Sequence, residues 1–208
     1  FENVSFNYDN SEKILNDINL TINDGEVICL TGASGCGKTT ITRLLNGTIP
    51  HFFHGEIDGR IIVNGKDITK QSIYEVSQVS GSVFQNPRSQ FFCLNTTSEL
   101  AFEPENFGVE PNEINTQIAN SAYEFNIEHL LDRGIFNLSG GEKQRISIAR
   151  ALYADPDFLL LDEASSSLDS ETEYEIMSHM RSLKDSVTII AITHNPKLID
   201  TEDVVIQL

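Results

Sequence analysis

The segment from Gly32 to Thr39, which reads Gly-Ala-Ser-Gly-Cys-Gly-Lys-Thr, constrains the fold more than any other part of the chain. It follows an apolar run at 27–30, typical of a strand buried on both faces, and it precedes a predicted helix at 39–45. Glycines let successive backbone N–H groups turn toward one anion, and the start of the helix adds its dipole. The pattern therefore predicts a phosphate-binding loop for a nucleotide, in which Lys38 reaches the β- and γ-phosphates and the Thr39 hydroxyl coordinates Mg²⁺.

A second apolar run, at 158–161, ends in two carboxylates, Asp162 and Glu163. Ligands of open α/β sheets bind at the carboxyl ends of the strands, where this pair would lie. Asp162 is predicted to belong to the Mg²⁺ shell and Glu163 to polarise an attacking water. The alternative is an ordinary strand followed by acidic residues that cap a helix. The phosphate loop upstream favours the chemical role.

Composition excludes several classes of protein. The chain has 208 residues with 14 Lys and Arg against 31 Asp and Glu, which gives a net charge of -17. Such a chain does not bind nucleic acid or lipid by bulk electrostatics. Its longest apolar runs, 158–161 and 187–192, are far shorter than the roughly 20 residues of a membrane-spanning helix. The odd number of cysteines without C-x-x-C spacing predicts free thiols in a reducing cytosol: Cys29, Cys36 and Cys93.

The order of patterns predicts an α/β fold. Alternation at Val4, Phe6 and Tyr8 indicates short antiparallel strands at the front. The apolar runs at 158–161 and 187–192, with a helical stretch at 170–183 between them, indicate βαβ units and a parallel sheet covered by helices on both sides. Helix-compatible spacing across the middle predicts a helical insertion. We expect a nucleotide-binding core at about 1–86 and 156–208, a helical subdomain at about 87–155, and a longer parent polypeptide.

The segment 138–145, Leu-Ser-Gly-Gly-Glu-Lys-Gln-Arg, predicts a second anion site. Ser-Gly-Gly at the start of a helix leaves an exposed N-terminus with small residues that let a phosphate come close. Because the chain already has one phosphate loop, the second site suggests a head-to-tail pair in which this segment closes over a nucleotide held by another copy. The plainer alternative is a helix with a glycine-rich N-cap and a basic first turn.

Together these motifs resemble the ATP-binding cassette of ABC transporters over essentially all 208 residues. The resemblance implies a P-loop NTPase with a mainly parallel sheet, an N-terminal antiparallel β layer and an inserted helical subdomain. It also implies ATP and Mg²⁺ as ligands. The motifs that carry it are Tyr8, residues 32–39, Gln85, residues 138–145, Asp162 with Glu163, residues 166–169, and His194.

The resemblance implies a role for each of these positions. Tyr8 would stack on adenine, or be a core aromatic. Asp169 would cross the seam between two cassettes, or cap a helix. The implied catalytic residues are Glu163, His194, Gln85 and Lys38, and the implied Mg²⁺ ligands are Thr39, Gln85 and Asp162. The implied nucleotide contacts are Tyr8, Gly32, Ala33, Ser34, Gly35, Cys36, Gly37, Lys38, Thr39, Thr40, Ser139, Gly140, Gly141 and Asp169.

A finer resemblance, carried by residues 83–92 and 99–106, is to the ATPases of energy-coupling-factor importers of cobalt and vitamins. It implies an importer for a vitamin or metal ion, driven by dimerisation with an identical or sister cassette and docked to a transmembrane subunit at the cytoplasmic face of the membrane. It implies neither nucleic acid as a partner nor insertion into lipid. Four residues would line the groove for that subunit, or belong to the subdomain core: Phe91, Phe92, Phe102 and Phe107.

Two alternatives stay open. A soluble ABC protein that acts on ribosomes or DNA would carry basic arms or very long coiled coils, whereas this chain is acidic and only about a hundred residues separate Lys38 from Ser139. A regulatory cassette would bind ATP with little hydrolysis, and the presence of Glu163, Gln85 and His194 argues against it.

Overall fold

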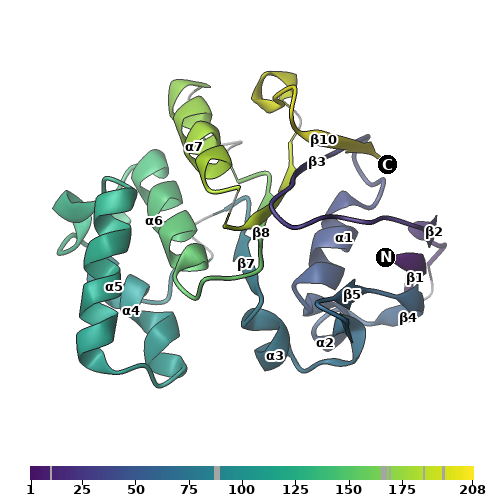
Figure 1. The fold of residues 1–208 in the computed structure, drawn as a ribbon, viewed down its shortest axis with the longest axis horizontal. Coiled ribbons are helices and arrows are strands. Elements are labelled where there is room, and N and C mark those ends of the chain that lie inside the picture. Colours follow the sequence, from purple (N-terminus) through teal and green to yellow (C-terminus); the bar gives the residue numbers. More distant parts are fainter. Residues whose placement is uncertain (10, 87–89, 165–167, 169, 185, 194) are drawn as a thin grey trace.

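A five-stranded parallel sheet forms the centre of the protein (Figure 1), with strand order β10-β3-β9-β8-β7. The computed structural model describes residues 1–9, 11–86, 90–164, 168, 170–184, 186–193 and 195–208. The strands are β3 (Val27–Thr31), β7 (Ser80–Val83), β8 (Phe158–Asp162), β9 (Thr188–Ile192) and β10 (Val204–Gln207). The predicted parallel sheet is confirmed.

The apolar runs of these strands are buried on both faces of the sheet because successive side chains point to opposite sides. Leu159 and Leu161 belong to one hydrophobic cluster, whereas Leu160 and Ile190 belong to another. The sheet therefore separates a first core, which contains Leu159 and Leu161, from a second core, which contains Leu160 and Ile190, and helices cover both.

An antiparallel sheet of order β2-β1-β4 stands beside the second core. Val4 and Phe6 of β1 are fully buried there, as their alternation predicts. The turn at Asn64 and Gly65 has positive φ at both residues, which is the geometry of a tight hairpin. The elements are β1 (Glu2–Tyr8), β2 (Leu15–Ile18), β4 (Gly55–Arg60), the hairpin β5 (Ile62–Val63) and β6 (Lys66–Asp67), and the helices α1 (Lys38–Leu45), α2 (Thr48–His51) and α3 (Ile73–Ser77).

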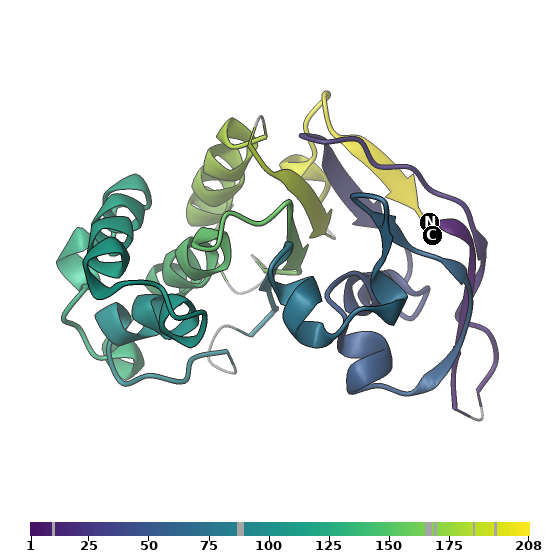
Figure 2. The same cartoon turned by 60° about the horizontal axis from the view of Figure 1, so that its bottom comes forward.

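The predicted helical insertion is a group of helices on the other side of the parallel sheet from the antiparallel strands (Figure 2). Helices α6 and α7 pack on the first core, and α4 and α5 extend it outward. The insertion comprises α4 (Thr96–Asn106), α5 (Pro111–Glu124) and α6 (Gly140–Leu152), whereas α7 (Ser170–Ser182) is the predicted helix between β8 and β9. Within the described ranges, no helix has both the length and the apolar character needed to cross a bilayer. The predicted subdomain limits at 86 and 156 stay a prediction.

Candidate functional site

The predicted phosphate loop connects the carboxyl end of β3 to α1. Lys38 is almost completely buried, and its Nζ donates to the carbonyl oxygens of Gly32 at 3.0 Å and Ala33 at 2.9 Å. Gly37, the N-cap of α1, has φ 108°, and a Cβ there would lie 2.7 Å from a methyl carbon of Leu15. Only glycine fits this position. The loop therefore curls around the Lys38 ammonium and leads directly into the start of a helix.

Tyr8, at the end of β1, lies beside the start of α1. Its hydroxyl accepts a hydrogen bond from Nη1 of Arg43 at 3.0 Å and lies 3.4 Å from Oγ1 of Thr40. The ring packs edge-on against Phe6. Thr40 is buried beneath this contact, whereas Thr39 is exposed. The structure thus places Tyr8 next to the loop. Its stacking on adenine stays a prediction.

Asp162 ends β8 in the neighbourhood of the loop. Burial raises the pKa of its carboxyl group, and the charge of Glu163 raises it further, while Arg43 and Lys38 act in the opposite direction. A bound divalent cation would favour the ionised form of this carboxylate. Carboxylate, hydroxyl and amide oxygens are the hard ligands that Mg²⁺ prefers, so the predicted set of Asp162, Thr39 and Gln85 fits that ion in its chemistry.

Gln85 and Glu163 meet at the carboxyl edge of the sheet. Because β7 and β8 are neighbouring parallel strands, the residues that follow them lie side by side, and Nε2 of Gln85 donates to Oε2 of Glu163 at 2.8 Å. Glu163 has φ 49°, in the left-handed region, and its N–H donates to the carbonyl oxygen of Ile192 at 3.2 Å. The structure therefore brings these two predicted catalytic residues into direct contact.

The predicted second anion site is the start of α6. Ser139 is its N-cap and forms a reciprocal capping box with Glu142: Oγ of Ser139 accepts from the Glu142 N–H at 3.3 Å, and Oε2 of Glu142 accepts from the Ser139 N–H at 2.7 Å. Ser139 and Gly140 are exposed. Helices α1 and α6 pack on opposite cores, so this exposed end belongs to a different surface from the loop. The predicted residues His194 and Asp169 lie outside the described residues.

A groove of about 520 Å³ lies between α3, α4 and the segment after β7. Phe92, of which 74% is exposed, stacks on Phe102 with ring centroids 5.2 Å apart. The ring centroids of Tyr74 and Phe107, which also line the groove, are 5.5 Å apart. Phe91 packs against the core instead, so three of the four predicted phenylalanines line the groove. No motif in the sequence indicates Tyr74, because its place in the groove depends on a contact between α3 and the end of α4, which lie far apart in the sequence.

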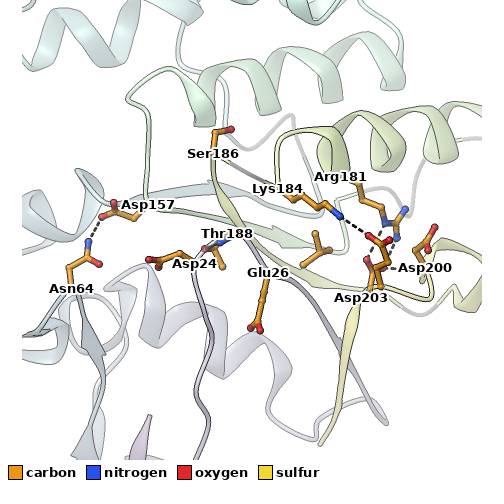
Figure 3. A pocket seen from close by; sticks show the side chains of 13 residues that line it. Asp24, Glu26, Asn64, Asp157, Arg181, Lys184, Ser186, Thr188, Asp200 and Asp203 are labelled. Carbon is orange, nitrogen blue, oxygen red and sulfur yellow. Dashed lines mark hydrogen bonds and ion pairs between the residues drawn. The ribbon is translucent and has the colours of Figure 1, made fainter.

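Another cavity, of about 760 Å³, lies at the amino ends of the parallel strands, on the opposite edge of the sheet from the Gln85–Glu163 pair (Figure 3). There Arg181 pairs with Asp203 at 2.6 Å, and Lys184 pairs with Glu202 at 2.6 Å. Glu26, which immediately precedes β3, also lines the cavity, whereas the phosphate loop follows the end of β3. This cavity is therefore separate from the loop and from the Gln85–Glu163 pair.

We predict that alkylation of Cys36 by a thiol reagent abolishes ATP binding and that ATP protects the protein. Cys36 is partly exposed and its Sγ lies 3.7 Å from Nζ of Lys38, so an added group would occupy the predicted phosphate position. Cys29 is a poor target because burial raises its pKa to about 12. The check is nucleotide binding after modification, with mass spectrometry to locate the label. Cys36→Ser should resist the reagent, and full activity of a Cys36-modified sample would contradict the prediction.

Comparisons with known proteins agree with this geometry. The sequence profile of the family described as ABC transporter matches residues 15–166. A putative ABC transporter ATP-binding protein of Pyrococcus abyssi is 42% identical over 197 residues, which are 93% of this chain and 70% of that protein. A similarly named Treponema denticola protein is 44% identical over 92% of this chain, but the chain spans only 40% of that relative.

Two further relatives bear on the subtype. The protein named energy-coupling factor transporter ATP-binding protein EcfA of Malacoplasma penetrans is 35% identical over 93% of this chain and 67% of its own length. The solved structure of CbiO1 from Clostridium perfringens, titled as part of the ABC transporter complex cbiONQ, superposes with a TM-score of 0.85 at 31% identity, over 95% of this chain and 78% of that one. With the family match, these relatives show that the chain belongs to the ABC transporter family, among relatives that are named ATP-binding proteins.

Proposed function

We propose that the chain is the ATP-hydrolysing unit of a membrane importer of the energy-coupling-factor type, for a vitamin or a metal ion. The observation that carries this proposal is that one segment of the chain contributes both to the predicted catalytic pair and to the wall of the apolar groove. Gln85, which contacts Glu163, and Phe92, which lines the apolar groove, both lie between β7 and α4. A partner seated in the groove would therefore touch the same segment as the hydrolytic pair.

In the proposed mechanism, the triphosphate of ATP lies along residues 32–39, with Lys38 as the charge for the β- and γ-phosphates and Tyr8 against adenine. Bound Mg²⁺, held by Thr39, Asp162 and Gln85, would neutralise charge on the phosphates. Glu163 accepts the proton of the attacking water as general base. His194 orients the γ-phosphate in this proposal.

A second cassette, identical or a sister domain, completes the site. Its residues 139–141 offer an exposed helix N-terminus to the γ-phosphate. In this proposal its Asp169 would cross the seam between the two cassettes. Binding of ATP would close the pair and hydrolysis would reopen it. The placement of α1 and α6 on opposite faces of the sheet supports this division, since one chain's α6 start and its own loop belong to different surfaces.

The groove supports a membrane partner that is a protein rather than lipid. Its walls combine aromatic rings with polar atoms of Glu103 and Arg150, which suits a short helix with an apolar face. The relatives named EcfA and CbiO1 support the importer subtype. In this proposal the chain works at the cytoplasmic face of the membrane and reaches it through the groove.

We predict that Phe92→Ser and Phe102→Ser each lower recovery of the full-length protein with its membrane subunit after detergent extraction. Each change removes half of a stacked pair that a partner would bury; a buried aromatic anchor at an interface contributes on the order of 2 kcal/mol, or about thirtyfold in affinity. Tyr123→Ser is the matched control, because Tyr123 is 77% exposed on α5 and does not line the groove.

Unchanged membrane recovery of both groove variants would contradict the proposed docking site. Recovery of the unmodified full-length protein with ribosomes or DNA, and without any membrane subunit, would favour the non-transport alternative.

A further inference from the structure

A buried carboxylate fastens the segment between β7 and α4. Glu99, in the first turn of α4, has a completely buried side chain. Its Oε2 accepts hydrogen bonds from the N–H groups of Phe92 at 3.0 Å and Cys93 at 2.8 Å. Its Oε1 accepts from Nη1 of Arg150 at 2.6 Å. Glu99 thus holds two consecutive backbone groups of the segment at the edge of the groove.

The side chain of Gln90 forms hydrogen bonds at the β7 end of the same segment. Its Oε1 accepts from the N–H of Phe84 at 3.0 Å, and its Nε2 donates to the carbonyl oxygen of Ser82 at 3.1 Å. Ser82 lies in β7 and Phe84 immediately precedes Gln85. Gln90 therefore bonds to the backbone on the strand side of Gln85.

Arg150 contacts both Glu99 and Gln90. Its Nη1 donates both to Glu99 and to the backbone carbonyl oxygen of Gln90, the latter at 2.6 Å. Arg150 lies in the last turn of α6, the helix that begins after Ser139, and only 12% of its side chain is exposed. Arg150 also lines the groove. One guanidinium group therefore connects α6, α4 and the segment that carries Gln85.

We infer that Glu99 and Arg150 are positioning residues for ATP hydrolysis, which hold Gln85 on Glu163 and link that contact to the groove. This inference rests on the proposed function, since it assigns Gln85 a part in hydrolysis. A buried charge whose partner is removed is strongly destabilising, so loss of either residue releases the segment. Release would leave the phosphate loop intact, because α1, the helix that begins at Lys38, packs on the other core through Ile41 and Leu44.

The test uses Glu99→Gln in the full-length protein. The substitution keeps the size of the side chain and removes its charge. We expect kcat for ATP to fall by about tenfold to a hundredfold, the effect of misplacing a catalytic group by about 1 Å, while KM changes by less than about twofold. Amide hydrogen exchange should become faster at Phe92 and Cys93. Arg150→Lys keeps the charge and should retain more activity than Arg150→Met, and this pair tests the inference where Glu99→Gln folds poorly.

The chain offers a matched control and an internal test. Asp203→Asn breaks an ion pair of the same kind, Arg181–Asp203, with side chains 18% and 2% exposed, at the opposite edge of the sheet. It should lower the melting temperature without changing kcat at 25 °C. If Glu99 acts through Gln85, adding Glu99→Gln to Gln85→Ala should lower kcat no further, whereas independent effects would add.

Each outcome has a distinct meaning. If Gln85→Ala hydrolyses ATP normally, the role of Gln85 in the proposed function is wrong and this inference is overturned with it. If Gln85→Ala is slow but Glu99→Gln and Arg150→Met keep full kcat, the inference alone is overturned. Additive effects in the double variant, or an equal loss of kcat in Asp203→Asn, also overturn it, because a general loss of stability would then explain the result.

Discussion

Replacing Glu163 by Gln is expected to stop ATP hydrolysis while ATP stays bound. The amide has the same shape and can still contact Gln85, which lies 2.8 Å away, but it cannot take a proton from water. Loss of a general base lowers kcat by on the order of 10²- to 10⁴-fold. Because the phosphate loop is unchanged, affinity for ATP should be retained. The closed pair of cassettes should accumulate, because in the proposed mechanism only hydrolysis reopens it.

The measurement is size-exclusion chromatography of the Glu163→Gln protein with ATP, together with a single-turnover hydrolysis assay. Glu202→Gln is the control, since Glu202 is an exposed glutamate paired with Lys184 at the far edge of the sheet. It should behave like the unmodified protein. Normal turnover by Glu163→Gln would place the general base elsewhere.

Mixing two inactive variants is expected to restore hydrolysis if the partner is an identical copy. Lys38→Met removes the charge that binds the β- and γ-phosphates in the proposed mechanism, and Ser139→Asp places a negative charge where the γ-phosphate would approach. Asp is as good an N-cap as Ser, so the capping of α6 is preserved. In a head-to-tail pair of the two variants, one composite site carries both defects and the other carries neither.

Equal amounts of the two variants should therefore recover about a quarter of the unmodified activity, since half of the pairs are mixed and each mixed pair has one intact site. Ser139→Asn, a neutral N-cap, is the control for Ser139→Asp and should keep most of the activity. No recovery, with Ser139→Asp still inactive, indicates a sister cassette as the partner. Full activity of Ser139→Asp alone would remove residues 139–141 from the site.

Much of the fold follows from local sequence patterns. Residues 32–39, the buried runs at 158–161 and 187–192, and the alternation at Val4 and Phe6 each specify an element by short-range rules, and the structure confirms them. Leu20 and Ile22 also alternate, but β2 ends at Ile18, where its register with β1 ends, and beyond that point Leu20 exchanges backbone hydrogen bonds with Phe1. Local periodicity cannot show where pairing stops.

The supports of the candidate site are less visible in the sequence. Gln85 and Glu163 are 78 positions apart, and only the parallel pairing of β7 with β8 brings them together. The Glu99–Arg150 pair spans 51 positions, and nothing in either local sequence indicates a buried charge. Such pairs depend on how α4 and α6 pack, which is a property of the whole fold.

The left-handed backbone at Glu163 has a consequence for selection that acts on the stability of this protein. A non-glycine residue at φ 49° costs on the order of 1–3 kcal/mol, and Gly or Asn would relieve part of that strain. The free energy of unfolding of natural domains is only about 5–15 kcal/mol, so a strain of this size matters. If Glu163 is the general base, as proposed, screening for heat resistance alone should therefore enrich Gly or Asn at position 163 and yield more stable proteins that do not hydrolyse ATP. Only selection for turnover keeps glutamate at this position.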